Sequence, residues 1–372
     1  MEYPEPPLVG AEPCRGRARI TSSAGDGTGS GDRTRTIRPT GLLSHPLLVG
    51  VAVSRHRHHA AASDGRTRRF DNTASGHRAL AVWLQRTARV VIEATGTYGL
   101  DLALALHGDD RCEVMVANPR LIKGFAQAVA QRSKTDAADA KTILAFAERM
   151  PFEPWSPPEA DVLELRAMAR RIGDLPVERT RERNRLSALR ASAAHSRAVA
   201  GDIEVNLRHL ERRIERMVAR AVALIEDHAG LAEAYDHLTS IKGVATKSAV
   251  ALLPELLVLP PTLSPKQWVA HAGLDPRDHE SGTSVRRRAR ISKVGNAHIR
   301  RARYMPALVA SRSEPRVKAY YEELRARGKP ARVAHVAVMR KLLHAVHGML
   351  RHGADFDGER FRATPQKAAA EA

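Results

Sequence analysis

The chain has 372 residues and carries 60 Lys and Arg against 41 Asp and Glu, so its net charge is +19 and its pI is about 10.7. This length allows two or three domains, and 43% hydrophobic with 27% charged residues is typical of a globular protein rather than a disordered one. Such a charge excess favours a polyanionic partner, most often nucleic acid. Genome composition can also enrich Arg, so the 49 Arg among the 60 basic residues identify no function.

Several other classes of protein are excluded by simple features. The two cysteines, Cys14 and Cys112, lie far apart and lack the paired spacing of a zinc site or a disulfide scaffold, which fits a reducing cytoplasm. No apolar run approaches the roughly 20 residues that a membrane span requires. The N-terminus contains Glu2, Glu5 and Glu12 and no apolar segment, so it does not resemble a secretory signal. We therefore expect a basic cytoplasmic protein with no membrane partner.

The N-terminal half divides into a tail and a predicted α/β domain. Residues 1–45 are rich in Gly, Pro, Ser, Thr and Arg without apolar periodicity, so we expect a disordered tail or an over-extended translation start. Residues 46–155 predict a mixed sheet, because a hairpin turning at Asp64-Gly65 precedes strands that alternate with helices. Strands are expected over 47–53, 58–63, 67–70, 90–94 and 112–116, and helices over 76–85, 100–106, 121–130 and 136–147.

The remainder of the chain predicts an all-helical part. Residues 156–235 carry apolar side chains at helical spacing between Arg and Glu, which favours a long helical hairpin or coiled coil. Gly173 and Pro176 interrupt its first helix, so we expect a kink or break there. Residues 236–352 predict a helical C-terminal domain that contains a basic loop, and residues 353–372 are expected to form a disordered tail.

Three acidic residues form the first candidate site. Glu93 closes a buried strand, where an α/β sheet presents side chains to a ligand. Asp136 and Asp139 lie on one face at the start of a helix. Carboxylates that converge from a strand end and a helix start can hold hard cations such as Mg²⁺, and paired metals promote phosphodiester chemistry. The alternative for the two aspartates is helix capping, with an acid at N3 opposite the N-cap residue.

Basic and glycine-containing segments form further candidates. The turn at Lys242-Gly243 can offer backbone N–H groups to a phosphate, or it is simply a helix C-cap. Ser281 stands in a Gly-flanked loop just before a stretch with eight Lys or Arg and no acid, which is suited to phosphate contact; a turn beside a solvated charged face is the alternative. The expected nucleic-acid contacts in that stretch are Arg286, Arg287, Arg288, Arg290, Lys293, Arg300 and Arg301.

These segments together resemble the bacterial insertion-sequence transposases of the DEDD type, also described as bridge-RNA-guided recombinases. The resemblance runs from about residue 47 to 351. It is carried by four motifs in the order of that family: IEATGTY at 92–98, KTDAADA at 134–140, GLDP at 273–276 with Ser281-Gly282, and ISKVGN at 291–296.

The resemblance implies a RuvC-like, ribonuclease-H-type domain, a coiled coil for dimerisation and a C-terminal transposase domain. It implies four acids that bind Mg²⁺, of which Glu93, Asp136 and Asp139 would be three, and a nucleophilic serine at Ser281. It further implies DNA at the nucleoid as substrate, a non-coding guide RNA and a homo-oligomer, dimer or tetramer.

The opening strand departs from the family pattern, since Ala52 stands where the first aspartate is usual. A methyl group cannot coordinate a cation, so we expect this copy to be impaired in strand exchange. Smaller departures are Ala245 in the glycine turn and Pro176 in the helical arm. The main hypothesis is a transposase or DNA recombinase. The alternatives are a non-catalytic nucleic-acid-binding relic and a metal-dependent RuvC-type nuclease that has no need of Ser281.

Overall fold

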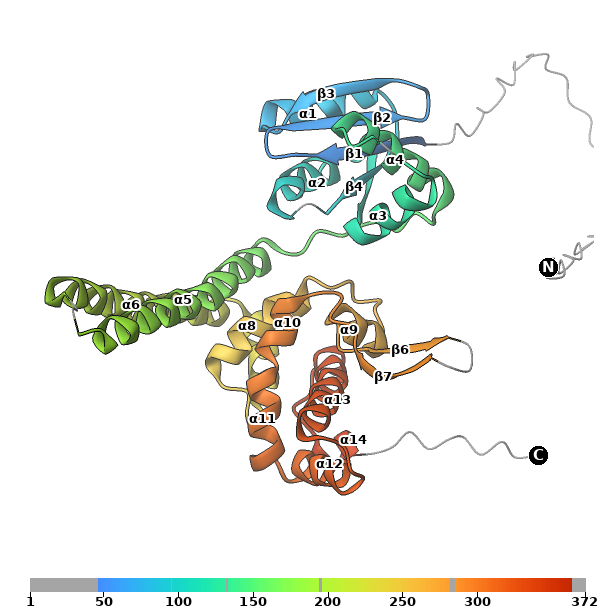
Figure 1. Ribbon diagram of the computed structural model, residues 1–372. Helices are drawn as coiled ribbons and strands as arrows, with labels where there is room; N and C mark the ends of the chain where they lie inside the picture. The colour runs from blue at the N-terminus through green and yellow to red at the C-terminus, as the bar shows by residue number, and fades with distance from the viewer. Residues whose placement is uncertain (1–45, 95, 132, 194–195, 282–284, 363–372) are drawn as a thin grey trace, which may run out of the picture. The chain divides into compact units, whose positions relative to one another are not determined.

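The computed structural model describes residues 46–362 except positions 95, 132, 194–195 and 282–284 (Figure 1). The tail expected over 1–45 and the last part of the expected C-terminal tail, 363–372, lie outside these residues. The described chain consists of an α/β domain followed by a helical region, and each is described by itself.

A five-stranded mixed sheet forms the α/β domain, which confirms the predicted fold class. Its strand order is β3-β2-β1-β4-β5; the pairs β1–β2 and β2–β3 are antiparallel, and β1–β4 and β4–β5 are parallel. The strands are β1 (Leu47–Val53), β2 (Arg57–Ala62), β3 (Thr67–Asp71), β4 (Ala88–Glu93) and β5 (Cys112–Ala117). Gly65 turns the predicted β2–β3 hairpin with a φ of 88°, a value that favours glycine.

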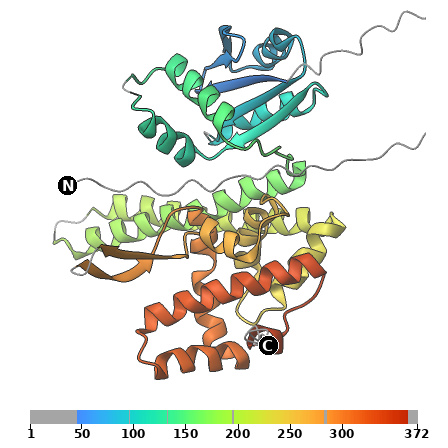
Figure 2. The same ribbon diagram turned by 90° about the vertical axis from the view of Figure 1, so that its right-hand side faces the viewer.

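Helices cover both faces of this sheet (Figures 1 and 2). Alternate side chains of a strand point to opposite faces, so Val49 and Val51 pack with Leu80 and Leu102 on one side, whereas Ala52 packs with Ile143 on the other. The first face is covered by α1 (Ala74–Leu84) and α2 (Leu100–His107), which follows the short 3-10 turn Gly96–Gly99. The second is covered by α3 (Pro119–Ala128) and α4 (Asp136–Arg149).

Gly50 fixes where α4 crosses the sheet. A Cβ atom at this position would lie 2.2 Å from the backbone nitrogen of Leu144 and 2.5 Å from the carbonyl oxygen of Ala140. Because only glycine permits this approach, α4 rests directly on β1. Its first turn, which carries Asp136 and Asp139, is thereby held near the end of the strand where Ala52 lies.

A long helical hairpin opens the helical region. It consists of α5 (Ala160–Ala191) and α6 (Arg197–Glu226), which lie side by side in both views. Of the kink or break expected at Pro176, the break is wrong, because α5 continues through this residue; the kink stays a prediction. The proline removes one backbone hydrogen bond, but Leu175 packs with Leu210 and Ile214 of α6 on the adjacent turn and keeps the segment helical.

The C-terminal part contains eight helices and a β-hairpin within the described residues. Two expectations are corrected here. The basic segment is not a loop, because 285–291 forms the second strand of the hairpin. Residues 358–362 form a helix whose Phe361 is only 3% exposed, so the tail does not begin at 353; burial of this aromatic side chain orders the segment. The elements are α7 (Ala229–Thr239), α8 (Thr246–Leu257), α9 (Pro265–His271), β6 (Pro276–Ser281), β7 (Val285–Ile291), α10 (Ala297–Ala302), α11 (Tyr304–Ser313), α12 (Pro315–Ala326), α13 (Ala331–His352) and α14 (Gly358–Arg362).

One hydrophobic core joins the inner half of the hairpin to the C-terminal helices. Leu165 and Ile172 of α5 and Ile225 of α6 belong to the same buried cluster as Leu253 of α8 and Leu342 of α13. The division expected at 235/236 therefore does not separate two cores. Among the described residues, no helix has the length and apolar character needed to cross a membrane.

Arg303 is an exception in this core. It lies between α10 and α11, is 3% exposed, and its Nε and Nη1 atoms have no hydrogen-bond partner among the described residues. Burial lowers the pKa of its guanidinium to about 9. Buried donors without acceptors and a desolvated charge are both unfavourable, so we expect this residue to lower the stability of the fold.

We expect Arg303→Met to stabilise the protein by about 2 kcal/mol, because methionine fills similar volume without a charge to desolvate. Thermal unfolding with denaturant titration measures the gain. Arg301→Met, a change at an exposed neighbour, is the control and should leave stability within about 0.5 kcal/mol of the original. A drop in stability for Arg303→Met would show that the guanidinium has an acceptor.

Candidate active site

Glu93 and Ala52 lie side by side at the ends of two parallel strands. Val51 of β1 pairs with Ile92 of β4, and Ala52 and Glu93 are the next residues of each strand. Val91 and Ala52 both pack in the core beneath α3 and α4, so Glu93, two residues beyond Val91, faces the same side. The residue that replaces the first expected acid is therefore a direct neighbour of the second.

The start of α4 supplies the two aspartates, and capping does not explain them. The N-cap is Thr135, whose Oγ1 accepts a hydrogen bond of 3.1 Å from the Ala138 backbone N–H. Asp139 is consequently at N4 rather than N3, so the proposed capping pair does not form. Its Oδ1 instead accepts a hydrogen bond of 3.0 Å from Nε2 of Gln131.

The charges of Glu93 and Asp139 interact. Burial raises the pKa of Glu93 above its ordinary value, and the negative charge of Asp139 raises it further. Two carboxylates in this relation repel each other unless a cation or a proton lies between them. The carboxylates of Glu93 and Asp139 are therefore arranged so that a positive charge between them would be favourable.

Sequence reasoning missed three residues around these acids. His59 pairs across β1–β2 with Ala52, and its Nδ1 lies 3.6 Å from Oδ2 of Asp136. Gln131 holds Asp139 and also accepts a short hydrogen bond from Thr142 of α4. The alternation of β2, which places His59 on the α4 side with Ala61, was the available signal for the histidine. No sequence pattern pointed to Gln131.

The acids present fall short of a complete cation site. In the part of the chain that the structure describes, no three His, Cys, Asp or Glu side chains are gathered closely enough to hold a metal ion. Ala52, at the centre of the expected set, provides a methyl group in place of an oxygen ligand. Hard cations such as Mg²⁺ require several oxygen ligands in near-ideal geometry, so the side chains as they stand do not fit the ion that the resemblance implies.

The second candidate site is the β6–β7 hairpin, in which residues 278–289 are described by backbone alone. Ser281 is the last residue of β6 and pairs with Val285, beside the tip of the hairpin. The following strand positions pair Arg286 with Glu280 and Arg287 with His279. The backbone therefore places the candidate nucleophile one residue from the start of the arginine-rich segment, on an extension of the helical core (Figure 1).

Two sequence motifs close the base of this hairpin. Oγ of Ser292 donates a 2.5 Å hydrogen bond to Oδ1 of Asp275, and the N–H of Lys293 donates to the Gly273 carbonyl at 3.1 Å. Gly295 has a φ of 123°, and a Cβ there would lie 2.1 Å from the His271 carbonyl oxygen. The motifs at 273–276 and 291–296 thus have a shared structural role: they lock the two ends of the hairpin together.

Glu255 connects this base to the helical arm. Its carboxylate is 1% exposed and accepts hydrogen bonds from Arg170 Nε at 2.7 Å, from Arg166 Nε at 3.2 Å and from Asn296 Nδ2 at 2.7 Å. The Asn296 Oδ1 in turn caps α10. Burial alone would raise the pKa of Glu255, but the hydrogen bonds from the two arginines prevail and lower it to about 2.

The remaining expected contacts are spread over the helical region. Lys242 is exposed in the α7–α8 turn, where Gly243 has a φ of 116°; a Cβ there would lie 2.8 Å from the backbone nitrogen of Ala310, so close packing on α11 explains this glycine. Arg300 donates from Nη1 to the Ala272 carbonyl at 2.9 Å, which gives it a structural role. Among the residues of this set whose side chains the structure describes, Lys242, Arg290, Lys293 and Arg301 are exposed and available for contact.

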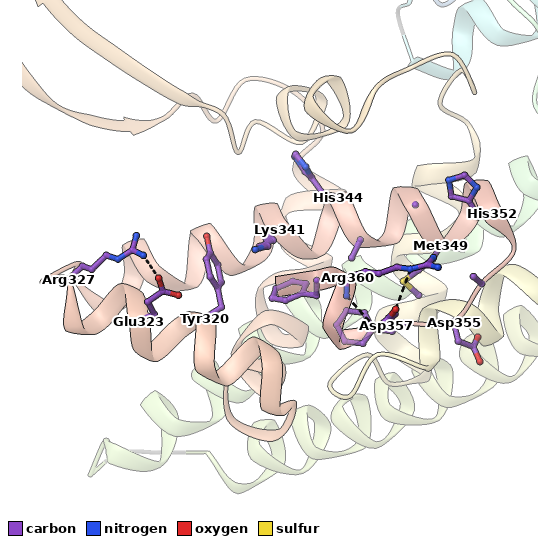
Figure 3. Close-up of a pocket in the computed structure, with 15 residues that line it drawn as sticks. Tyr320, Glu323, Arg327, Lys341, His344, Met349, His352, Asp355, Asp357 and Arg360 are labelled. Carbon is purple, nitrogen blue, oxygen red and sulfur yellow. Dashed lines mark hydrogen bonds and ion pairs between the residues drawn. The ribbon is translucent and has the colours of Figure 1, made fainter. Parts of the chain in front are cut away.

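A cavity of about 850 Å³ lies between α12, α13 and α14, apart from the Ser281 hairpin. Figure 3 shows its lining, where the side chain of Lys341 lies near that of Tyr320. The Lys341 Nζ is 4.6 Å from the ring centre of Tyr320 and 5.2 Å from that of Phe361. These contacts stabilise the packing of α13 on α12 and α14, and none of the predicted site residues lines the cavity.

Comparison with known proteins finds matches for both parts of the chain. A family model described as Transposase matches residues 49–193, and one described as Transposase IS116/IS110/IS902 family matches residues 235–322. The pilin gene-inverting protein of Moraxella bovis is 28% identical over 302 residues, 77% of this chain and 89% of that protein, and the same values hold for its namesake in Moraxella lacunata. An IS110 insertion-element protein of 43.6 kDa from Streptomyces coelicolor is 30% identical over 149 residues, 40% of this chain and 35% of that protein.

The matches show that the chain is of the class of transposases and DNA recombinases, which are enzymes. Within this class the chain belongs to the IS110 family of insertion-sequence transposases. The family resemblance inferred from the four motifs is thereby confirmed, since two of them lie in the first matched region and two in the second.

Glu255→Gln should destabilise the protein by about 3 kcal/mol, because it leaves two arginines beside a neutral group in a buried place. The folded-state pKa of about 2 lies below the ordinary value of 4.5, so the stabilisation is present above pH 4.5 and is lost as the pH falls toward 2. Urea unfolding between pH 6 and pH 2 measures this. The original protein should lose stability across that range more steeply than the variant.

The control is Glu178→Gln, which breaks a half-exposed ion pair between Glu178 and Arg171, both on α5. This variant should lose less than about 1 kcal/mol. Equal losses for the two variants would contradict the special role of Glu255.

Proposed function

We propose that this transposase recombines DNA by attack of the Ser281 hydroxyl on a phosphodiester. The pairing of Ser281, the last residue of β6, with Val285, the first residue of the arginine-rich strand β7, is the observation that carries the proposal. The serine oxygen would bond to phosphorus while the bond to the leaving deoxyribose oxygen breaks. That oxygen takes up the proton released by the serine. Arginines of β7 would stabilise the negative charge that develops on the phosphate.

The partners and setting follow from this activity and from the family resemblance. A non-coding guide RNA would select donor and target DNA by base pairing, and two or four copies of the chain would hold the DNA ends. The α5–α6 hairpin, as a coiled coil, would be the element for dimerisation. The substrate places the protein in the cytoplasm at the nucleoid.

We further propose that this copy is impaired. The set of Glu93, Asp136 and Asp139 lacks the oxygen ligand that an aspartate at position 52 would supply, and the ion that the set would hold is Mg²⁺. The alternative function, a nucleic-acid-binding relic without catalysis, is favoured by Ala52. A RuvC-type nuclease that acts without Ser281 is the third hypothesis.

The serine mechanism predicts a covalent protein–DNA adduct. Incubation with labelled DNA that carries the element ends, followed by denaturing gel electrophoresis, should show a shifted band. Ser281→Ala should abolish this band because it removes the proposed nucleophilic oxygen, whereas Ser313→Ala, at an exposed helical serine, should retain it. Full recombination by Ser281→Ala would overturn the serine mechanism and support the nuclease.

The impairment predicts that Ala52→Asp improves both metal binding and recombination. The new carboxylate would lie beside Glu93, so Mg²⁺ affinity, measured by calorimetry, and recombination rate should each rise at least about tenfold. Ala52→Asn has the same shape without the charge and should gain neither. Equal and robust recombination by the original chain and the aspartate variant would refute the impairment.

A further inference from the structure

The α5–α6 hairpin carries a groove along one side of the seam between its helices. This groove has a volume of about 230 Å³, with Leu175 and Met217 at its base. Four arginines line it: Arg171, Arg213, Arg216 and Arg220. We call it the arginine groove.

The arginines of α6 that line the groove have no carboxylate partner among the residues that the structure describes. Within the groove only Arg171 is paired, through Nη1 with Glu178 at 2.9 Å. Several other arginines of the hairpin lie close to acids: Arg179 and Arg183 are each 3.9 Å from Glu211, and Arg190 is paired with Glu204. Arg181, Arg208 and Arg212 have no carboxylate partner among the described residues either, but they do not line the groove. The groove is therefore the place on the hairpin where three unpaired arginines and Arg171 surround one hollow.

The spacing of these cations matches a linear polyanion. Arg213, Arg216 and Arg220 are separated by three and four residues, so they share one face of α6. At a rise of about 1.5 Å per residue they span about 10 Å along the helix. Over that length a DNA duplex presents about six phosphate charges, one per ~1.7 Å. Guanidinium groups bind phosphates through paired, charge-assisted hydrogen bonds.

Self-association through the groove itself is unfavourable. A two-fold dimer with the groove on its axis would bring the four arginines of one chain against those of the other. Like charges in contact are unfavourable, and no acid lines the groove. An acidic partner fits the groove better than a second copy of the same groove.

We infer that the arginine groove binds the phosphodiester backbone of DNA, outside the segment that the β6–β7 hairpin would hold. This inference rests on the proposed function, in which DNA is the substrate. The helical arm would then grip flanking duplex without reading its sequence, because backbone contacts position a protein and carry no base information.

The test compares three variants of the full chain for binding to a labelled 40-bp duplex over a salt series. R213Q/R216Q/R220Q removes the groove charges. R179Q/R183Q/R190Q removes the same charge from the paired side of the hairpin, and R213K/R216K/R220K keeps charge in the groove. Circular dichroism confirms that each variant remains helical.

The groove variant should bind DNA at least about tenfold more weakly at 0.1 M salt, and the slope of log K against log salt should fall by about 2 to 3. The control should lose less than about threefold, and the lysine variant should retain most of the affinity. Equal losses for the groove and control variants would overturn the inference, as would a change in oligomeric state without a change in affinity. Loss confined to a labelled RNA of equal length would overturn DNA as the partner.

Failure of the proposed function gives a different result from failure of the groove assignment. If the original chain binds no DNA at any salt concentration, the substrate itself is wrong, whatever the variants do. If it binds DNA and forms the Ser281 adduct while the groove variant is unaffected, only the groove assignment fails.

Discussion

A single buried carboxylate, that of Glu255, connects the parts of the helical region that the chemistry would need. It receives hydrogen bonds from Arg166 and Arg170 of the arm and from Asn296 at the base of the hairpin that carries Ser281. A carboxylate 1% exposed would be unfavourable alone, so each partner depends on the others. The arm, α8 and the hairpin base consequently form one unit, in which Asn296 links the hairpin base to the carboxylate.

Sequence reasoning predicted most helices and strands, but it did not predict the contacts between residues that are distant in the sequence. Hydrophobic alternation and the Asp64-Gly65 turn are local signals, and they predicted all five strands of the sheet to within a few residues. The motifs at 273–276 and 291–296 indicated the family resemblance, but the sequence did not predict that Asp275, Ser292 and Gly295 close the hairpin. Partners 17 residues or more apart, such as Glu255 and Arg170, leave no local pattern.

Packing also reversed two expectations that local propensity supported. Pro176 should interrupt a helix, but the seam with α6 buries Leu175 and outweighs one missing hydrogen bond. The polar segment after residue 353 lacks periodicity, but Phe361 fills a place beside Tyr320. In the site, the spacing of Asp136 and Asp139 predicted their shared face. It could not predict that Thr135 would be the N-cap residue and that Asp139 would accept a hydrogen bond from Gln131.

At position 52, the residue that cation binding would need differs from the residue that favours stability without a cation. The position is 6% exposed and lies between Glu93 and the start of α4, where Asp139 already raises the pKa of Glu93. A further carboxylate there would add repulsion and desolvation, which only a bound cation offsets. Alanine removes both costs, so losing the acid favours the metal-free fold. Gly50, in contrast, has no substitute that lets α4 approach β1. Steric and hydrogen-bonding constraints thus hold the architecture in place, while the residue that the proposed metal chemistry needs most can be lost without any penalty in packing.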